Sequence, residues 1–200
     1  VRPTEKRNGT VNAPLLTIEL KSVGRDALAL RAYHHKGAGP KKPSFPLSLS
    51  PRETWVEEED NRIVFHAGRL SAYIQKKPFR IRYYEGARLL TGKSLAYMTL
   101  PDGSHRMKEE LSLGVGELIY GLGERFTPFA KNGQQVDLVN EDGGTASEQA
   151  YKNIPFYLSS QGYGVFIDTP APVSLEIASE KVERVQFSVA GEELSYCIIG

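Results

Sequence analysis

Cysteine is nearly absent from this sequence of 200 residues, in which Cys197 stands alone. A single cysteine cannot form an intrachain disulfide, so a core must stabilise the chain, and we expect a cytoplasmic location. Cys197 lies in the alternating stretch LSYCII with no identifiable base beside it. We therefore expect it to pack inside the protein and not to act as a nucleophile.

Long apolar runs and an excess of charge of either sign are also missing. No apolar stretch approaches the roughly 20 residues that a membrane-spanning helix needs, so we expect no membrane partner. The 25 Lys and Arg residues nearly balance the 24 Asp and Glu residues, which leaves a formal net charge of +1. Such a chain lacks a field suited to phosphate backbones, and we expect no nucleic-acid partner.

Patterns for metals and nucleotide cofactors are absent as well. His34 and His35 are adjacent and would point to opposite faces of a strand, while His66 and His105 are isolated, so we expect no metal site. The stretch GVGELIYGLGERF lacks the third glycine of a dinucleotide-binding loop and is not followed by a helix pattern. Its glycines are more simply explained by strand ends or bulges, and no cofactor is expected.

The sequence does contain a regular alternation of apolar and polar residues. Segments of this kind, separated by Gly, Pro, Asn and Asp, are expected to form strands at residues 15–20, 27–33, 62–66, 70–75, 79–84, 96–100, 155–159, 164–168, 173–177, 185–189 and 194–199. No convincing helical stripe exceeds ten residues. We therefore predict an all-β fold, an antiparallel β-sandwich over residues 15–200 after a flexible segment 1–14.

Two segments depart from the alternation. Residues 36–52, KGAGPKKPSFPLSLSPR, carry four prolines and two glycines and indicate an irregular connection or a sheet edge. The acidic run at residues 57–60, EEED, is most simply a solvated turn.

A dense polar run follows an acidic glycine loop in NEDGGTASEQAYKN, residues 140–153. Asp142 precedes Gly143 and Gly144, an arrangement that can hold a carboxylate at the tip of a tight loop. An Asx-type turn that only satisfies nearby amides explains Asp142 equally simply. The polar side chains after it, Ser147, Glu148, Gln149, Tyr151, Lys152 and Asn153, suit recognition of a polyhydroxylated ligand or a polar partner domain.

At these residues the sequence resembles a known family. The stretches YGLGERF, NGQ, DGGT, EQAYKNIPFY and GYGV occur in order and at matching spacing. They resemble the N-terminal, galactose mutarotase-like β-sandwich of glycoside hydrolase family 31, in its α-xylosidase branch. The resemblance is densest over residues 111–170, continues to the end of the chain, and is loose over residues 15–110.

The resemblance implies a function that this chain would share with a second domain. In the family a (β/α)₈ barrel follows the sandwich and carries the aspartate nucleophile and the aspartic acid/base, so no catalytic residue is expected in this chain. The complete enzyme would be a retaining exo-α-glycosidase that hydrolyses terminal α-linked xylose or glucose, with its two carboxyl groups about 5 Å apart. The implied partners are that barrel and α-xylosides or α-glucosides, and the sequence is compatible with a homo-oligomer.

The resemblance also assigns roles to the polar run. A loop at about residues 131–153 would reach the rim of the active site, where Asp142 would bind the sugar in the leaving-group subsite. Its neighbours would shape the loop or face the barrel: Gly143, Gly144, Thr145, Glu148, Gln149, Tyr151 and Asn153. Glu124 and Arg125 look structural or interfacial.

Two alternative functions stay open from the sequence. A free-standing carbohydrate-binding module would use exposed aromatic residues, for which Tyr73, Tyr83 and Tyr84 are candidates. A mutarotase-like aldose epimerase would need a general acid and base, but the four histidines lie outside the dense motif region.

Overall fold

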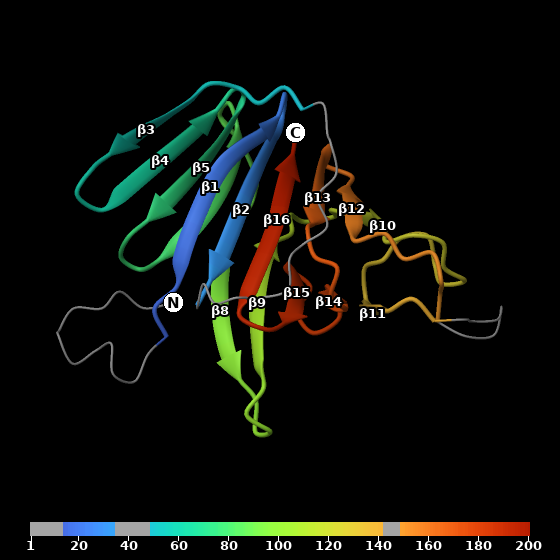
Figure 1. Ribbon diagram of the computed structural model, residues 1–200. Helices are drawn as coiled ribbons and strands as arrows, with labels where there is room; N and C mark the ends of the chain where they lie inside the picture. The colour runs from blue at the N-terminus through green and yellow to red at the C-terminus, as the bar shows by residue number, and fades with distance from the viewer. Residues whose placement is uncertain (1–13, 35–48, 142–148) are drawn as a thin grey trace.

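The computed structural model describes residues 14–34, 49–141 and 149–200, which form sixteen strands and no helix. The strands build three antiparallel sheets (Figure 1). Within these ranges, no helix of a length and apolarity that could cross a membrane is found. The predicted all-β, antiparallel fold is confirmed.

The three sheets, called the six-stranded sheet, the β9 sheet and the β5 sheet, have the following strand orders. The six-stranded sheet has the order β1 (Thr17–Gly24), β2 (Ala27–Tyr33), β16 (Glu193–Ile199), β13 (Tyr163–Ile167), β12 (Phe156–Ser159) and β10 (Ile119–Gly121). The β9 sheet has the order β11 (Gln134–Leu138), β14 (Val173–Ile177), β15 (Arg184–Ala190), β9 (His105–Ser112) and β8 (Ser94–Thr99). The β5 sheet runs β3 (Thr54–Glu58), β4 (Arg62–Ala67), β5 (Leu70–Gln75), β6 (Arg80–Glu85) and β7 (Arg88–Thr91).

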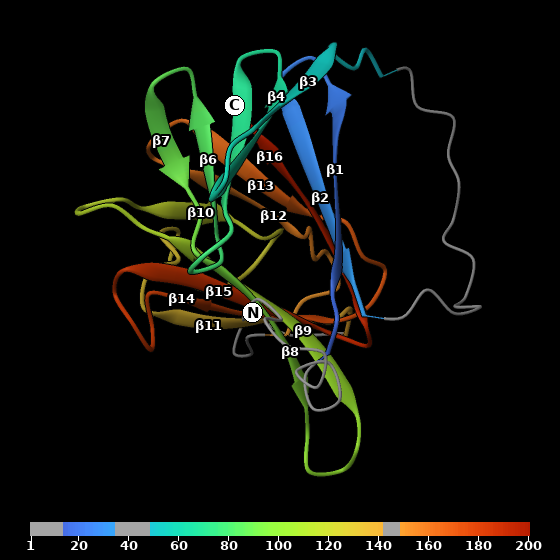
Figure 2. The ribbon, with the colours of Figure 1, turned by 90° about the vertical axis from the view of Figure 1, so that its left-hand side faces the viewer.

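One core joins the three sheets (Figure 2). Alternate residues of every sheet enter it, such as Leu30 of β2, Ile81 of β6 and Phe187 of β15, each 4% exposed or less. Burial of such side chains contributes about 1.5 to 3 kcal/mol apiece, which is why a chain without disulfides can hold these sheets together.

Polar groups meet at the junction of the sheets. The hydroxyls of Tyr83 and Tyr196 are 2.6 Å apart, and the Tyr196 hydroxyl donates to Glu109 Oε2 at 3.1 Å. The three residues come from β6, β16 and β9, one from each sheet. Burial raises the pKa of the Glu109 carboxyl well above its ordinary value. Enclosure of the side chain away from water thus favours its neutral form.

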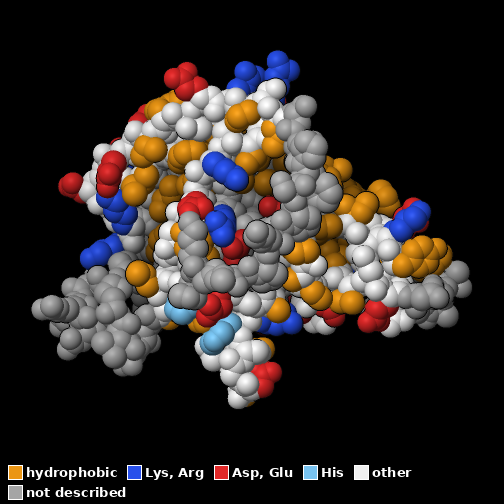
Figure 3. Space-filling model, viewed as in Figure 1, with side chains coloured by type: hydrophobic (Ala, Val, Ile, Leu, Met, Phe, Trp, Pro, Cys, Tyr) orange, Lys and Arg blue, Asp and Glu red, His pale blue; other side chains and the backbone are white. Residues whose placement is uncertain are grey.

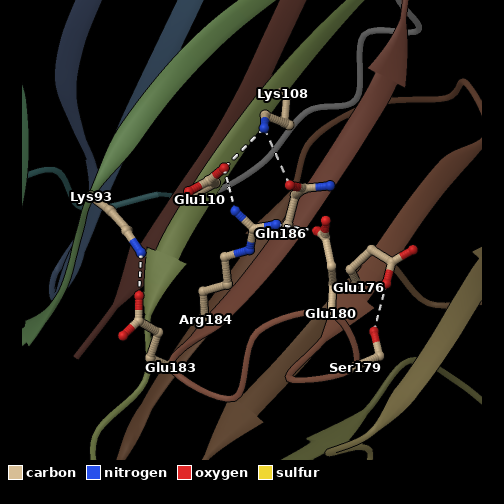
Figure 4. Close-up of polar contacts among 9 residues, drawn as sticks. All are labelled: Lys93, Lys108, Glu110, Glu176, Ser179, Glu180, Glu183, Arg184 and Gln186. Atoms are coloured by element: carbon tan, nitrogen blue, oxygen red, sulfur yellow. Dashed lines mark hydrogen bonds and ion pairs between the residues drawn. The ribbon is translucent and has the colours of Figure 1, made fainter.

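Charged residues also stabilise one face of the β9 sheet (Figure 4). Arg184 of β15 lies 2.6 Å from Glu110 of β9, and Lys108 lies 2.9 Å from the same carboxylate. A further pair, Lys93 and Glu183, is 3.0 Å apart at the edge of this face. Glu110 is thus paired with one cation across the strands and one on its own strand, and Glu183 is paired with Lys93, so these acidic groups stabilise the face.

The acidic run 57–60 is not simply the solvated turn that the sequence indicates. Thr54–Glu58 forms the edge strand β3, which pairs with β4 in antiparallel register. Only the residues after Glu58 turn toward β4. An edge strand is solvated on its open side, and its charged side chains discourage pairing with a second chain.

Four further strands were not predicted from alternation: β7, β9, β10 and β11. In β9 the sequence HRMKEELS places charged residues on both faces, and Glu109 is buried among apolar side chains. β10 is only three residues long and ends at a glycine. β11 does alternate, with Val136 and Leu138 buried, but over only five residues.

Candidate functional site

The candidate site is built on the YGLGERF segment, in which three successive residues take left-handed backbone conformations. The φ angles are +111° at Gly121, +69° at Leu122 and +89° at Gly123. A Cβ atom at residue 123 would lie 2.0 Å from the carbonyl oxygen of Lys152, closer than atoms can approach. The glycines therefore let this segment lie directly against residues 152–154, and the Glu124 amide donates to the Lys152 carbonyl at 3.1 Å.

Arg125 and Asn153 connect this segment to the predicted loop. The Arg125 guanidinium donates to the Asn153 side-chain oxygen and to the carbonyl of Asp137, the latter at 2.9 Å. The Asn153 amide nitrogen donates in turn to the carbonyls of Val139 and Ala150, at 2.8 and 2.7 Å. One arginine and one asparagine thus fasten both ends of the loop to each other and to the sandwich.

The two ends of the loop are also hydrogen-bonded directly to each other. The Glu141 amide donates to the Ala150 carbonyl at 3.2 Å, next to a parallel bridge between Asn140 and Ala150. The Gln149 side chain donates to Glu141 Oε2 at 2.7 Å. Residues 140–141 and 149–150 are therefore held together at one point.

The NGQ motif fixes the start of the predicted loop. The Asn132 side chain accepts a hydrogen bond from the Ile119 amide and donates one to the Glu117 carbonyl, both at 2.9 Å. These two bonds connect the motif to the start of β10. Lys131 is 4% exposed and donates to Thr127 Oγ1 at 3.0 Å. Burial, and then the charge of Arg125, lowers the pKa of Lys131. These internal hydrogen bonds are sufficient to explain the conformation of the segment around the NGQ motif.

Residues 139–141 and 149–153, which the hydrogen bonds between the two ends of the loop join, form the loop base. A pocket of about 360 Å³ opens between the YGLGERF segment and the loop base. Phe126 and Tyr151, 68% and 64% exposed, are among its walls. Lys152 and Glu124 pair across it at 2.9 Å. The pocket has aromatic surface and polar groups, and among the described residues that line it Glu124 is the single acid, an arrangement typical of a binding surface.

An exposed apolar surface continues from this pocket. Phe126, Phe129, Tyr151 and Ile154 form it, with exposed fractions between 53% and 80%. The Phe129 ring lies 5.1 Å from that of Tyr120. Figure 3 shows hydrophobic side chains on the right of the molecule, over the region where Figure 1 places β10–β12. Exposed apolar groups of this kind are typical of surfaces that contact another protein or a ligand.

The structure brings together some of the predicted site residues. Gln149 and Asn153 lie in the loop base and Tyr151 lies at the pocket, as described above. Five others lie outside the described residues: Asp142, Gly143, Gly144, Thr145 and Glu148. Sequence reasoning assigned Arg125 only a structural or interfacial role and missed Phe129 and Lys131. The YGLGERF glycines were the available signal, because they allow the close approach that places Arg125.

Two of the four histidines, His34 and His105, lie on either side of Tyr97 at one end of the β9 sheet. His34 Nδ1 and the Tyr97 hydroxyl bond to Glu192 Oε1 at 3.1 and 3.0 Å, and the His105 ring lies 5.2 Å from that of Tyr97. In the described part of the chain, no group of three or more His, Cys, Asp and Glu could hold a metal ion. Bonds from His34 and Tyr97 lower the pKa of Glu192, which makes it a weaker base. This arrangement does not favour epimerase chemistry.

Cys197 is half-buried in β16, where burial raises the pKa of its thiol to about 11. The thiolate is therefore scarce at neutral pH, which agrees with the packing role expected for this residue.

Comparisons with known proteins decide the family. Residues 17–176 match the profile of the glycosyl hydrolase 31 N-terminal galactose mutarotase-like domain. The chain belongs to glycoside hydrolase family 31. It corresponds to the N-terminal domain of that family.

Full-length relatives give the family 31 domain its context. It is 40% identical to α-xylosidase XylQ of Lactiplantibacillus pentosus and 38% identical to an α-xylosidase of Emericella nidulans, in each case over 96% of the chain. The aligned parts are 26% and 28% of those proteins, so the chain spans about a quarter of their length. The cycloalternan-forming enzyme of Listeria monocytogenes, solved with a pentasaccharide, has the same fold, with a TM-score of 0.75, 19% identity, and coverage of 94% of this chain and 19% of that one.

Proposed function

We propose that this chain is the N-terminal accessory domain of a retaining exo-α-glycosidase of the α-xylosidase type. The complete enzyme hydrolyses terminal α-linked xylose or glucose, and this domain supplies a loop to the rim of the active site. The supporting observation is the fixed loop base, in which Arg125 and Asn153 hold residues 139–141 and 149–153 at one point. The two curated α-xylosidases that contain an equivalent domain support the choice of enzyme class.

The geometry beside the loop base supports the proposed partner. Phe126, Phe129, Tyr151 and Ile154 form an apolar surface next to the loop, and a catalytic barrel would cover it. The loop would then be held at the junction between the two domains, close enough to the barrel to reach its substrate. Within that loop Asp142 is proposed to accept hydrogen bonds from the sugar in the leaving-group subsite.

The experiment is a comparison of full-length enzymes with aryl α-xyloside and aryl α-glucoside as substrates. Asp142→Ala is expected to lower kcat/KM about 5- to 150-fold, which corresponds to the loss of one hydrogen bond to a charged group, about 1 to 3 kcal/mol. Asp102→Ala is the matched control, because Asp102 lies in the turn between β8 and β9 and bonds only to the nearby Ser104 in the described residues.

Three outcomes bear on the proposal. An unchanged kcat/KM for Asp142→Ala across several leaving groups would remove Asp142 from the site. Turnover by the 200-residue chain alone would contradict the accessory role, because the proposed chemistry places both catalytic carboxyl groups in the barrel. A preference for the xyloside over the glucoside would place the enzyme in the α-xylosidase branch.

A further inference from the structure

The outer face of the β5 sheet carries an aromatic surface far from the loop. Trp55, His66, Ser71 and Tyr84 stand opposite one another on four successive strands. The next row of the same face contains Glu57, Val64, Tyr73 and Arg82. The opposite face of the sheet sends Ala72, Ile81 and Tyr83 into the core. Tyr83, 1% exposed, is therefore not an exposed candidate for sugar binding, whereas Tyr73 and Tyr84 remain available.

The aromatic rings of this face contact one another in pairs across neighbouring strands. Trp55 stacks on His66 with centroids 4.5 Å apart and an interplanar angle of 6°. Tyr73 and Tyr84 are 4.6 Å apart, and the Arg62 guanidinium lies 5.6 Å above the Tyr73 ring. Val64 faces the same way and is only 2% exposed although it is not part of the main core, because these side chains cover it.

Two recesses lie on this face and share Tyr73 as a wall. One, of about 550 Å³, contains Tyr73 and Tyr84; the other, of about 660 Å³, contains Trp55 and His66. Because neighbouring strands are about 4.8 Å apart, the Cα atoms of Trp55 and Tyr84 are separated by roughly 14 Å. That span suits several linked rings better than a single one.

The charges of the face indicate what kind of molecule it accepts. Four arginines and three carboxylates line the two recesses, and Arg62–Glu59 and Arg69–Glu85 are ion pairs of 2.5 and 2.8 Å. The face is thus close to electrically balanced and rich in donors and acceptors. Half of the Trp55 surface is exposed, and His66 covers one side of its indole, so the other side is open. Open aromatic faces flanked by hydrogen-bonding groups match the C–H and O–H surfaces of a sugar ring.

We propose that this face is a carbohydrate-binding site, which binds a neutral oligosaccharide along Trp55, Tyr73 and Tyr84. The aromatic rings stack on sugar rings, and Gln75, Arg80 and Arg82 bind hydroxyl groups. The proposal that a neutral oligosaccharide binds depends only on the observations made on this face. The choice of a xylose-substituted glucan as the natural occupant rests on the proposed function.

Trp55 makes the site directly measurable, because it is the only tryptophan of the chain. Titration of the 200-residue chain with a neutral xylosylated gluco-oligosaccharide is expected to give a saturable change in Trp55 fluorescence. Tyr73→Ala should weaken binding about 2- to 10-fold, the effect of losing one stacked aromatic group. Tyr33→Ala, which removes a tyrosine from β2 and not from this face, should leave binding unchanged. No saturation at millimolar oligosaccharide, or an equal loss in both variants, would overturn the proposal.

A second measurement uses the full-length enzyme in affinity electrophoresis through gels that contain the corresponding polysaccharide. Trp55→Ala should reduce retardation while turnover of a small aryl α-xyloside stays unchanged. If both fall together, binding belongs to the catalytic site and the proposal is wrong. If the enzyme has no activity on α-xylosides but retardation still depends on Trp55, the proposed function fails and the binding site stands. Tighter binding of an anionic oligogalacturonide would contradict a neutral occupant.

Discussion

A single methyl group at residue 123 would meet the peptide of residue 152, which makes Gly123 the most informative residue of the loop base. Gly123→Ala is expected to lower the free energy of unfolding by about 3 kcal/mol or more, because strain at positive φ adds to a backbone collision. Gly133→Ala is the matched control: its φ is +84°, close to the +89° of Gly123, but nothing lies within 4 Å of the added Cβ.

The control should lose only about 1 kcal/mol, the cost of the left-handed conformation itself. Urea denaturation of the 200-residue chain measures both values. Equal losses would mean that residues 152–154 move aside freely, and the loop base would then not be rigid.

Glu109 provides a test of pH dependence at the residue scale. Its pKa is raised in the folded state, so between the ordinary pKa of a glutamic acid and the raised value the folded chain binds one proton more than the unfolded chain. The stabilisation is therefore complete at low pH and declines as the pH rises, by up to about 1.4 kcal/mol per pH unit. Glu109→Gln keeps the shape of the side chain but does not titrate.

The measurement is the free energy of unfolding from pH 4.5 to pH 7.5. The stability of Glu109→Gln relative to the unmodified chain should increase with pH. Two parallel curves would show that Glu109 is ionised in the folded protein. Replacement of the exposed Glu53 by Gln controls for the loss of one carboxyl group.

At the scale of elements, the pairing of β9 with β15 depends on a buried ion pair. Arg184 and Glu110 have side chains that are 6% and 11% exposed. Arg184→Ala should destabilise the chain by about 3 to 5 kcal/mol, because it leaves Glu110 half-compensated in a poorly hydrated place. Lys93→Ala removes a pair whose partner Glu183 is 67% exposed, and it should cost less than about 1 kcal/mol. Thermal or urea unfolding compares the two, and similar losses would contradict the difference in burial.

Alternation predicted those strands whose two faces differ in polarity. β2, β5 and β14 have the expected bounds, since each sends apolar residues to the core at every second position. β9 was missed for the opposite reason: Lys108 and Glu110 form the ion-pair face, and Glu109 on the other face is a carboxyl group inside the core. A buried charge and a surface charge are indistinguishable in a sequence until their partners are known.

The loop base illustrates the same limit. The order of its motifs could be read from the sequence, but Arg125 and Asn153 are 28 positions apart, and nothing local says that they meet. The exposed aromatic residues Phe126 and Phe129 would ordinarily be expected inside a core. Only the fold shows that both side chains are largely exposed, at 68% and 80%.

At the scale of the whole molecule, that apolar surface should behave differently in the isolated domain and in the complete enzyme. Phe129, 80% exposed, lies on it. Phe129→Ser should leave the stability of the isolated chain nearly unchanged and reduce its self-association, because it removes exposed apolar area. In the full-length enzyme the same change should lower Tm, because the barrel would lose a contact there.

Light scattering of the chain and thermal unfolding of the full-length enzyme measure the two effects. Val182→Ser, an exposed apolar residue on the turn before β15, is the control, at 83% exposure. If both substitutions lower Tm of the full-length enzyme equally, Phe129 is not at the interface.

The central pairing of β2 with β16 has a consequence for how the protein is made. Arg31 and Glu193, which form an ion pair across these strands, are 162 positions apart. A ribosome that adds roughly 5 to 20 residues per second needs on the order of 10 to 30 s between these two positions. During that time the β1–β2 hairpin has no partner on the β2 side, so an unpaired strand edge stays open to contacts with other chains until β16 is made, and faster translation shortens this exposure.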